Sequence, residues 1–61
     1  MIEVTRLKGK KITVNAEMIE TIEETPDTVI TLVSGKKLIV SETSAEVAEM
    51  VIHYKKKIFT L

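Results

Sequence analysis

The side chains best placed to do chemistry are basic ones at two glycine-containing turns. The candidate partner-binding residues are Arg6, Lys8, Lys10, Lys11, Lys36 and Lys37. If both turns lie at the same end of a sheet, these residues form a local basic patch for an anionic partner: an acidic protein, nucleic acid or lipid headgroups. Lysines at turns also protect exposed strand edges from pairing with other chains, and that is the simpler interpretation. No aromatic residues that could stack on bases are interleaved with them.

Candidate catalytic groups are few. His53 is the only histidine, and Glu49 lies four residues before it. Histidine can act as a general base or a pH switch, but a solvated histidine beside Glu49 on a helix surface is the more ordinary interpretation. The sequence has neither a nucleophile-elbow pattern nor a glycine-rich loop that could cradle phosphate. We therefore predict that the protein is not an enzyme and has no catalytic residues.

Metal and cofactor sites are likewise not expected. Glu23, Glu24 and Asp27 surround a turn and could offer oxygen ligands to a divalent cation, but they lack the regular spacing of a calcium loop. The absence of cysteine, with a single histidine, excludes the usual zinc sites and any disulfide. We predict no metal and no cofactor.

Length and composition place these residues on one small domain, residues 1–61. The fraction of hydrophobic residues is 44%, which is more than one small interior can hold, and the net charge is zero. A neutral chain lacks the general electrostatic footprint of a nucleic-acid-binding domain. No apolar run is long enough to span a bilayer, and the first residues lack the pattern of a signal peptide. We expect a cytoplasmic protein.

Alternating apolar and polar residues predict strands in the first two thirds of the chain. Ile2 to Thr5 and Lys11 to Asn15 form a hairpin, with a twist or bulge expected near Leu7. A helical turn follows with Asn15 as its cap, and Met18, Ile19 and Ile22 then point inward. The next strand begins after this turn, with Glu20, Glu23 and Glu24 pointing outward, and further strands are expected at 29–33 and at 37–41, separated by turns at Pro26 and Gly35.

The last third has helical periodicity. Thr43 and Glu46 have the spacing of a capping box, and apolar residues recur from Val47 to Ile58. The predicted fold is therefore α+β: about five short antiparallel strands, as a hairpin and a three-stranded meander, with one C-terminal amphipathic helix.

Surplus apolar residues predict self-association. The strands at 29–33 and 37–41 carry apolar residues on both faces, whereas a sheet with one face in water should alternate cleanly. The helix also has a second apolar strip. The candidate interface residues for a homo-oligomer are Ile39, Ile52 and Phe59.

Several short motifs, in order, resemble the FlbD family of small flagellar proteins. They are the opening I-x-V-T-R-L with a turn ending at Gly9, Val14-Asn15, the run from Ile19 to Thr28, Gly35-Lys36-Lys37, and Tyr54-Lys55. The family's usual asparagine before Gly9 is Lys8 here. The resemblance implies a non-enzymatic cytoplasmic accessory protein of flagellar motility, binding a motor or basal-body protein, with the inner face of the membrane at the flagellar base as one location.

A fainter similarity to the DNA-binding LytTR domain rests on short strands, a Gly-Lys turn and a final helix. It leaves a second hypothesis open, a small nucleic-acid-binding regulator that uses the basic turns. Similarity of fold alone does not decide between the two functions.

Overall fold

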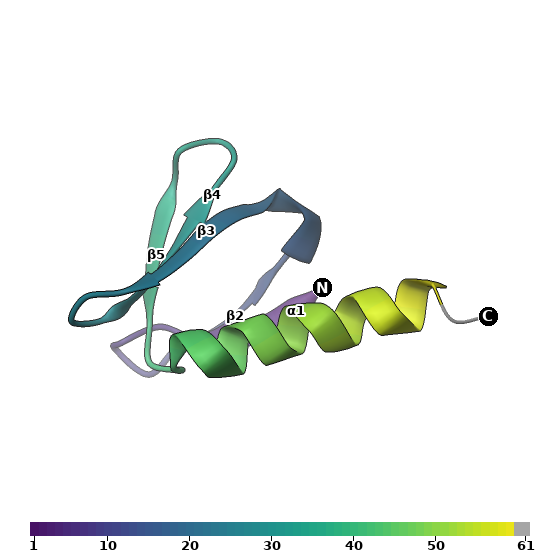
Figure 1. Cartoon of the computed structure of the whole chain (residues 1–61). Coiled ribbons are helices and arrows are strands. Elements are labelled where there is room, and N and C mark those ends of the chain that lie inside the picture. Colours follow the sequence, from purple (N-terminus) through teal and green to yellow (C-terminus); the bar gives the residue numbers. More distant parts are fainter. Residues whose placement is uncertain (60–61) are drawn as a thin grey trace.

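The computed structural model describes residues 1–59, apart from the side chain of Phe59, and forms an α+β fold (Figure 1). The elements in chain order are β1 (Ile2–Thr5), β2 (Lys11–Val14), the 3-10 helix η1 (Ala16–Met18), β3 (Ile19–Glu24), β4 (Thr28–Leu32), β5 (Lys37–Val40) and α1 (Ser44–Phe59). The strands form an antiparallel hairpin and an antiparallel three-stranded sheet of order β3-β4-β5. The predicted fold class is thus confirmed.

The β1–β2 hairpin has a regular register, with Ile2 opposite Val14 and Val4 opposite Ile12. Ile2, Val4 and Val14 are buried, as the alternating pattern predicts. Gly9 adopts a φ of 94°, which glycine allows without strain. The twist or bulge expected near Leu7 lies beyond the paired residues of this hairpin and stays a prediction, whereas the pairing of β3 with β4 has a register shift between Ile19 and Thr21.

The 3-10 helix η1 confirms the predicted turn after the hairpin. The Asn15 side chain accepts a hydrogen bond from the Glu17 N–H at 3.0 Å, as a capping residue does. Met18 is 48% exposed, so the expectation that it points inward is wrong. Its carbonyl accepts from the Val33 N–H at 2.8 Å, so the backbone here extends the pairing of β3 with β4.

Helix α1 begins with the predicted capping box. The Glu46 N–H donates to Thr43 Oγ1 at 3.1 Å, and the Thr43 N–H donates to Glu46 Oε1 at 2.8 Å. The Ser44 N–H donates to Glu24 Oε1 at 2.7 Å, which ties the start of α1 to the end of β3. Val47 is fully buried, and α1 contacts both β3 and β1.

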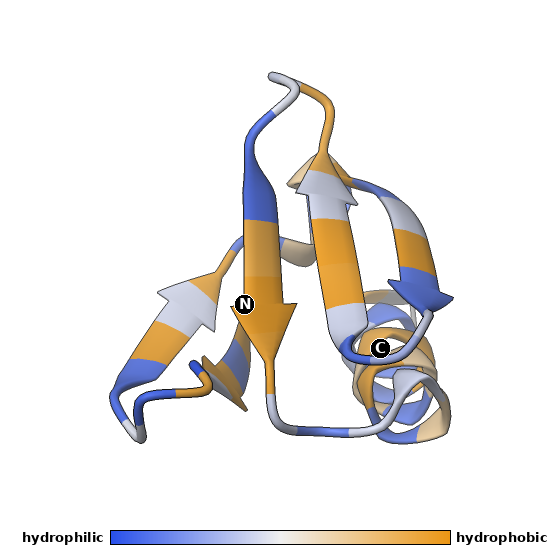
Figure 2. Cartoon of the chain, turned by 90° about the vertical axis from the view of Figure 1, so that its left-hand side faces the viewer, coloured by the Kyte–Doolittle hydropathy of each residue, from blue (hydrophilic) through white to orange (hydrophobic). Residues whose placement is uncertain are grey.

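Side chains from every layer build one core. Its buried members are Ile2, Val4, Val14, Ala16, Ile30, Leu38, Val40 and Val47. Figure 2 shows apolar bands, in orange, across the middle of the strands. The core therefore lies between the strands and α1, and it leaves the other face of β4 and β5 to solvent.

A seam of hydrogen bonds joins the hairpin to the three-stranded sheet. Arg6 bridges to Val40, and the Ser41 N–H donates to the Thr5 carbonyl at 2.8 Å. The Thr5 N–H donates to both carboxylate oxygens of Glu42, at 2.8 and 3.0 Å. Because these bonds place the end of β1 beside the end of β5, the seam also fixes the position of the β1–β2 turn.

Glu42 should make the stability of this seam depend on pH. Burial by itself would raise the pKa of Glu42, but the hydrogen bonds from the Thr5 N–H and the nearby charge of Lys11 hold that pKa below its ordinary value. A group with a lowered pKa in the folded state stabilises the fold above its unfolded pKa, about 4.3 for glutamate. This contribution should disappear as the pH falls through the lowered value.

Glu42→Gln is therefore expected to reduce the free energy of unfolding by about 1 kcal/mol at pH 7, since a charged acceptor is lost. The difference from wild type should begin to shrink as the pH falls below about 4.3, the unfolded-state pKa of glutamate, and should vanish once the pH is below the lowered pKa of the folded state. Urea unfolding at pH 7 and pH 3 measures both. Glu20→Gln, at an exposed position on β3, is the matched control, and an equal loss for both variants would contradict the assignment.

Candidate partner-binding groove

Four of the six candidate basic residues meet in a hollow between the β1–β2 turn and β5. The hollow measures about 560 Å³ and is lined by Arg6, Leu7, Lys8, Lys10, Lys37 and Ile39. The bridge from Arg6 to Val40 brings the turn to β5. Hydrogen bonds of 2.8 Å from the Arg6 N–H to the Lys10 carbonyl and from the Gly9 N–H to the Arg6 carbonyl keep the turn compact. The basic side chains thus come from two segments that are distant in sequence.

A second, smaller hollow adjoins the first on the solvent-facing side of the sheet. It measures about 250 Å³, is lined by Glu23, Thr25, Val29, Lys37 and Ile39, and shares Lys37 and Ile39 with the first. Val29 lies opposite both Glu23 on β3 and Ile39 on β5. We call the two hollows together the outer groove. One of its ends is basic, and the other carries the carboxylate of Glu23.

The floor of the outer groove is apolar and open to solvent. Leu7 is 53% exposed and Ile39 is 45% exposed, although both are large aliphatic side chains. Exposed apolar side chains that gather between charged ones are characteristic of interaction surfaces. Leu7 was not among the candidate residues from the sequence. An apolar residue that interrupts the strand alternation beside a turn is the signal that could have identified it.

The other two basic candidates lie elsewhere. Lys36 lines a separate hollow between β2 and the β4–β5 turn. This hollow shares only Arg6 with the basic end of the outer groove. Lys11 is close enough to Glu42 for its charge to lower the pKa of that carboxyl group. The structure therefore divides the predicted basic patch, and the part that includes Lys8, Lys10 and Lys37 faces the outer groove.

Two of the three candidate interface residues lie on different elements. Ile39 belongs to the outer groove, whereas Ile52 is 48% exposed on α1. The side chain of Phe59 lies outside the described part of the chain. Their role in self-association stays a prediction.

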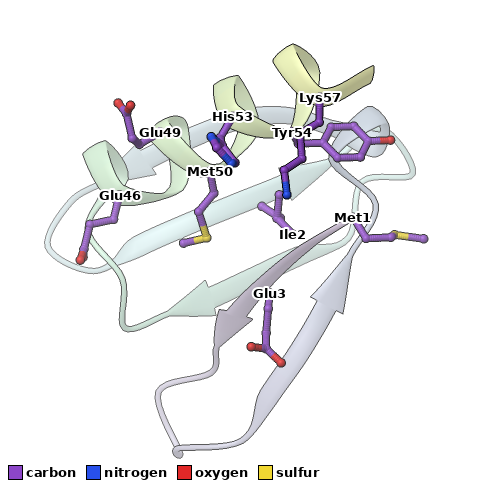
Figure 3. Close-up of a pocket in the computed structure, with 9 residues that line it drawn as sticks. All are labelled: Met1, Ile2, Glu3, Glu46, Glu49, Met50, His53, Tyr54 and Lys57. Atoms are coloured by element: carbon purple, nitrogen blue, oxygen red, sulfur yellow. The ribbon is translucent and has the colours of Figure 1, made fainter. Parts of the chain in front are cut away.

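His53 lies in a different place, in an open cleft of about 570 Å³ between α1 and β1 (Figure 3). The lining residues are Met1, Ile2, Glu3, Glu46, Glu49, Met50, His53, Tyr54 and Lys57. The cleft has an apolar base, and charged residues of both signs surround it. His53 itself is exposed on the helix. Sequence reasoning did not foresee this cleft, because it depends on how α1 lies relative to β1.

Among the acidic residues near the β3–β4 turn, Glu24 has a structural role. The hydrogen bond from the Ser44 backbone N–H lowers the pKa of Glu24 and satisfies a donor at the start of α1. Among residues 1–59, no group of three or more histidine, cysteine, aspartate or glutamate side chains is arranged to hold a metal ion.

The fold and its surface hollows together define a small α+β protein whose open hollows are lined by charged and apolar side chains. A comparison with protein-family models matches residues 1–59 to the family described as "Flagellar and Swarming motility proteins". The chain therefore belongs to the FlbD family, as its sequence motifs indicate. The searches among curated proteins and among solved structures returned no match. Within the described residues, no helix is long and apolar enough to cross a membrane.

Proposed function

We propose that this protein is a non-enzymatic, cytoplasmic accessory factor of flagellar motility that binds a motor or basal-body protein through the outer groove. Membership of the FlbD family supports the setting in motility. The observation that carries the binding mode is the exposure of Leu7 and Ile39 beside Lys8, Lys10 and Lys37. Such a surface suits a partner segment that has an apolar anchor and carboxylates around it.

An acidic protein fits the outer groove better than nucleic acid does. Phosphate backbones are bound mainly by lysine and arginine, and an apolar floor contributes nothing to that contact. Glu23 at the far end of the groove would also repel a phosphate. The net charge of zero points in the same direction.

The second candidate is a nucleic-acid-binding regulator. The convergence of Arg6, Lys8, Lys10 and Lys37 from two segments favours it, since four cations could each contact a phosphate. Titration with random duplex DNA at several salt concentrations separates the two functions. Phosphate binding gives a log–log slope close to one unit per phosphate contacted. A steep slope with submicromolar affinity at physiological salt would favour the regulator.

Deletion of the gene and complementation test the proposal. Loss of the gene is expected to reduce swimming or swarming, and wild-type protein should restore it. Ile39→Asp should fail to restore it while keeping a normal melting temperature, because Ile39 is exposed and its replacement disturbs the groove and not the core. Full rescue by a folded Ile39→Asp protein would exclude this part of the groove as the binding site.

A further inference from the structure

The face of α1 that borders the cleft carries opposite charges at its two ends. Glu46, Met50, His53 and Lys57 are spaced by four, three and four residues, so they form one stripe along the helix. Glu46 and Lys57 are eleven residues apart, about 16 Å along the axis. They are therefore too distant to pair within one helix.

Apolar side chains accompany this stripe. Met50 and Tyr54 are half-buried, and both line the cleft with Ile2 at its base. Figure 3 shows Met50 and Lys57 extending from α1 toward β1, while Glu49 points away from that strand. Methionine adapts its shape to irregular contacts, so Met50 can pack against a second surface without a preformed pocket.

We propose that two copies of this chain associate through this face, with their α1 helices antiparallel about a two-fold axis between positions 51 and 52. Glu46 of each copy then lies opposite Lys57 of the other, and Met50 lies opposite His53. A two-fold contact must be self-complementary, and the stripe has opposite charges at equal distances from its centre. The inference does not rest on the proposed function, because the outer groove takes no part in it.

The occupant is a second copy and not a basic segment of another protein, because the stripe is not uniformly acidic. Lys57 would repel a basic ligand at one end of the stripe, whereas an antiparallel copy places an opposite charge at both ends. One face of a 16-residue helix offers a limited contact area, and interfaces below about 1,200 Å² are usually weak. The dimer should therefore be in exchange with monomer at micromolar concentrations.

Charge-reversal variants, measured alone and as a mixture, provide the test. Glu46→Lys and Lys57→Glu should each weaken dimerisation roughly tenfold in sedimentation equilibrium, since each variant places two pairs of like charges in its own dimer. An equal mixture of the two variants should recover dimers, because both cross-chain pairs are then attractive. The double variant Glu46→Lys/Lys57→Glu should also dimerise like wild type.

Glu46 also belongs to the helix cap, so its replacement needs controls. Glu46→Gln keeps a capping oxygen and removes the charge, and it should weaken the dimer with an unchanged melting temperature. The cap defect of Glu46→Lys persists in the mixture, so recovery on mixing reports the charges alone.

Three results would overturn the inference. The first is a wild-type protein that is monomeric at about 1 mM, far above the range expected for even a weak specific interface. The second is weakening by Glu46→Lys without recovery in the mixture, which indicates that the lost helix cap, and not the charge, weakens the dimer. The third is a dimer that survives every charge change and is lost in Ile52→Asp, which places the contact on the other strip of α1.

Discussion

Ile30→Ala should leave a large part of the protein unfolded at room temperature. Ile30 has no exposed surface and lies in the central strand β4, opposite Ile22 on β3 and Leu38 on β5. Truncation of a buried isoleucine to alanine typically costs about 2–5 kcal/mol. A core in a chain this short rarely supplies more than about 3–5 kcal/mol. The loss is therefore comparable to the whole stability, and urea unfolding followed by circular dichroism measures it.

Ile39→Ala is the matched control, because Ile39 occupies the adjacent strand and faces solvent. Its free energy of unfolding should stay within about 0.5 kcal/mol of wild type. Similar losses for both variants would mean that the outer groove is covered in solution and that Ile39 is buried by a second molecule. A stable Ile30→Ala protein would show that the core can collapse around the missing methyl groups.

Reversal of charge in the outer groove should abolish function without unfolding the protein. Lys8, Lys10 and Lys37 line the groove and are exposed, so their replacement by glutamate has a small structural cost. Against an acidic partner, like charges at the interface cost several kcal/mol, which corresponds to a loss of affinity of at least about a hundredfold. Complementation of a deletion strain on motility agar should give the phenotype of the deletion.

A second triple variant distinguishes the loss of the groove lysines from the change in net charge of the protein. Lys36, Lys55 and Lys56 are exposed lysines outside the groove, and their reversal changes the total charge equally. This variant should restore motility when its melting temperature is near that of wild type. If it fails while folded, net charge is the cause. If the groove variant swims normally, its lysines serve only to protect the strand edges.

Local patterns in the sequence were sufficient to predict the elements of the fold. Alternation located the buried side chains of β1, and the spacing of Thr43 and Glu46 located the start of α1. Glycine located the turns, since Gly9 and Gly35 both have positive φ. These signals depend only on residues close together in the chain, so they can be recognised in the sequence without knowledge of the tertiary structure.

The parts that could not be predicted depend on contacts between distant residues. The lysines at two turns predicted one basic patch. The pairing of Arg6 with Val40 places the β1–β2 turn beside β5, so Lys37 lines the same hollow as Lys8 and Lys10, whereas Lys36 lines another. The exposure of Met18 has a similar origin. The register of β3, shifted between Ile19 and Thr21, determines which side chains face inward. Periodicity of the sequence alone does not reveal such a shift.

The seam between Thr5 and Glu42 also has a consequence for the order of folding. Its hydrogen bonds join residues separated by 37 positions, whereas each hairpin pairs near neighbours. Closing a long loop loses chain entropy before any contact compensates, so contacts of this kind slow folding. The meander and the hairpin can each form early, but the groove between them exists only after the seam closes. The outer groove is thus among the last parts of the molecule to be completed, and a nascent chain cannot present it until Glu42 has been synthesised.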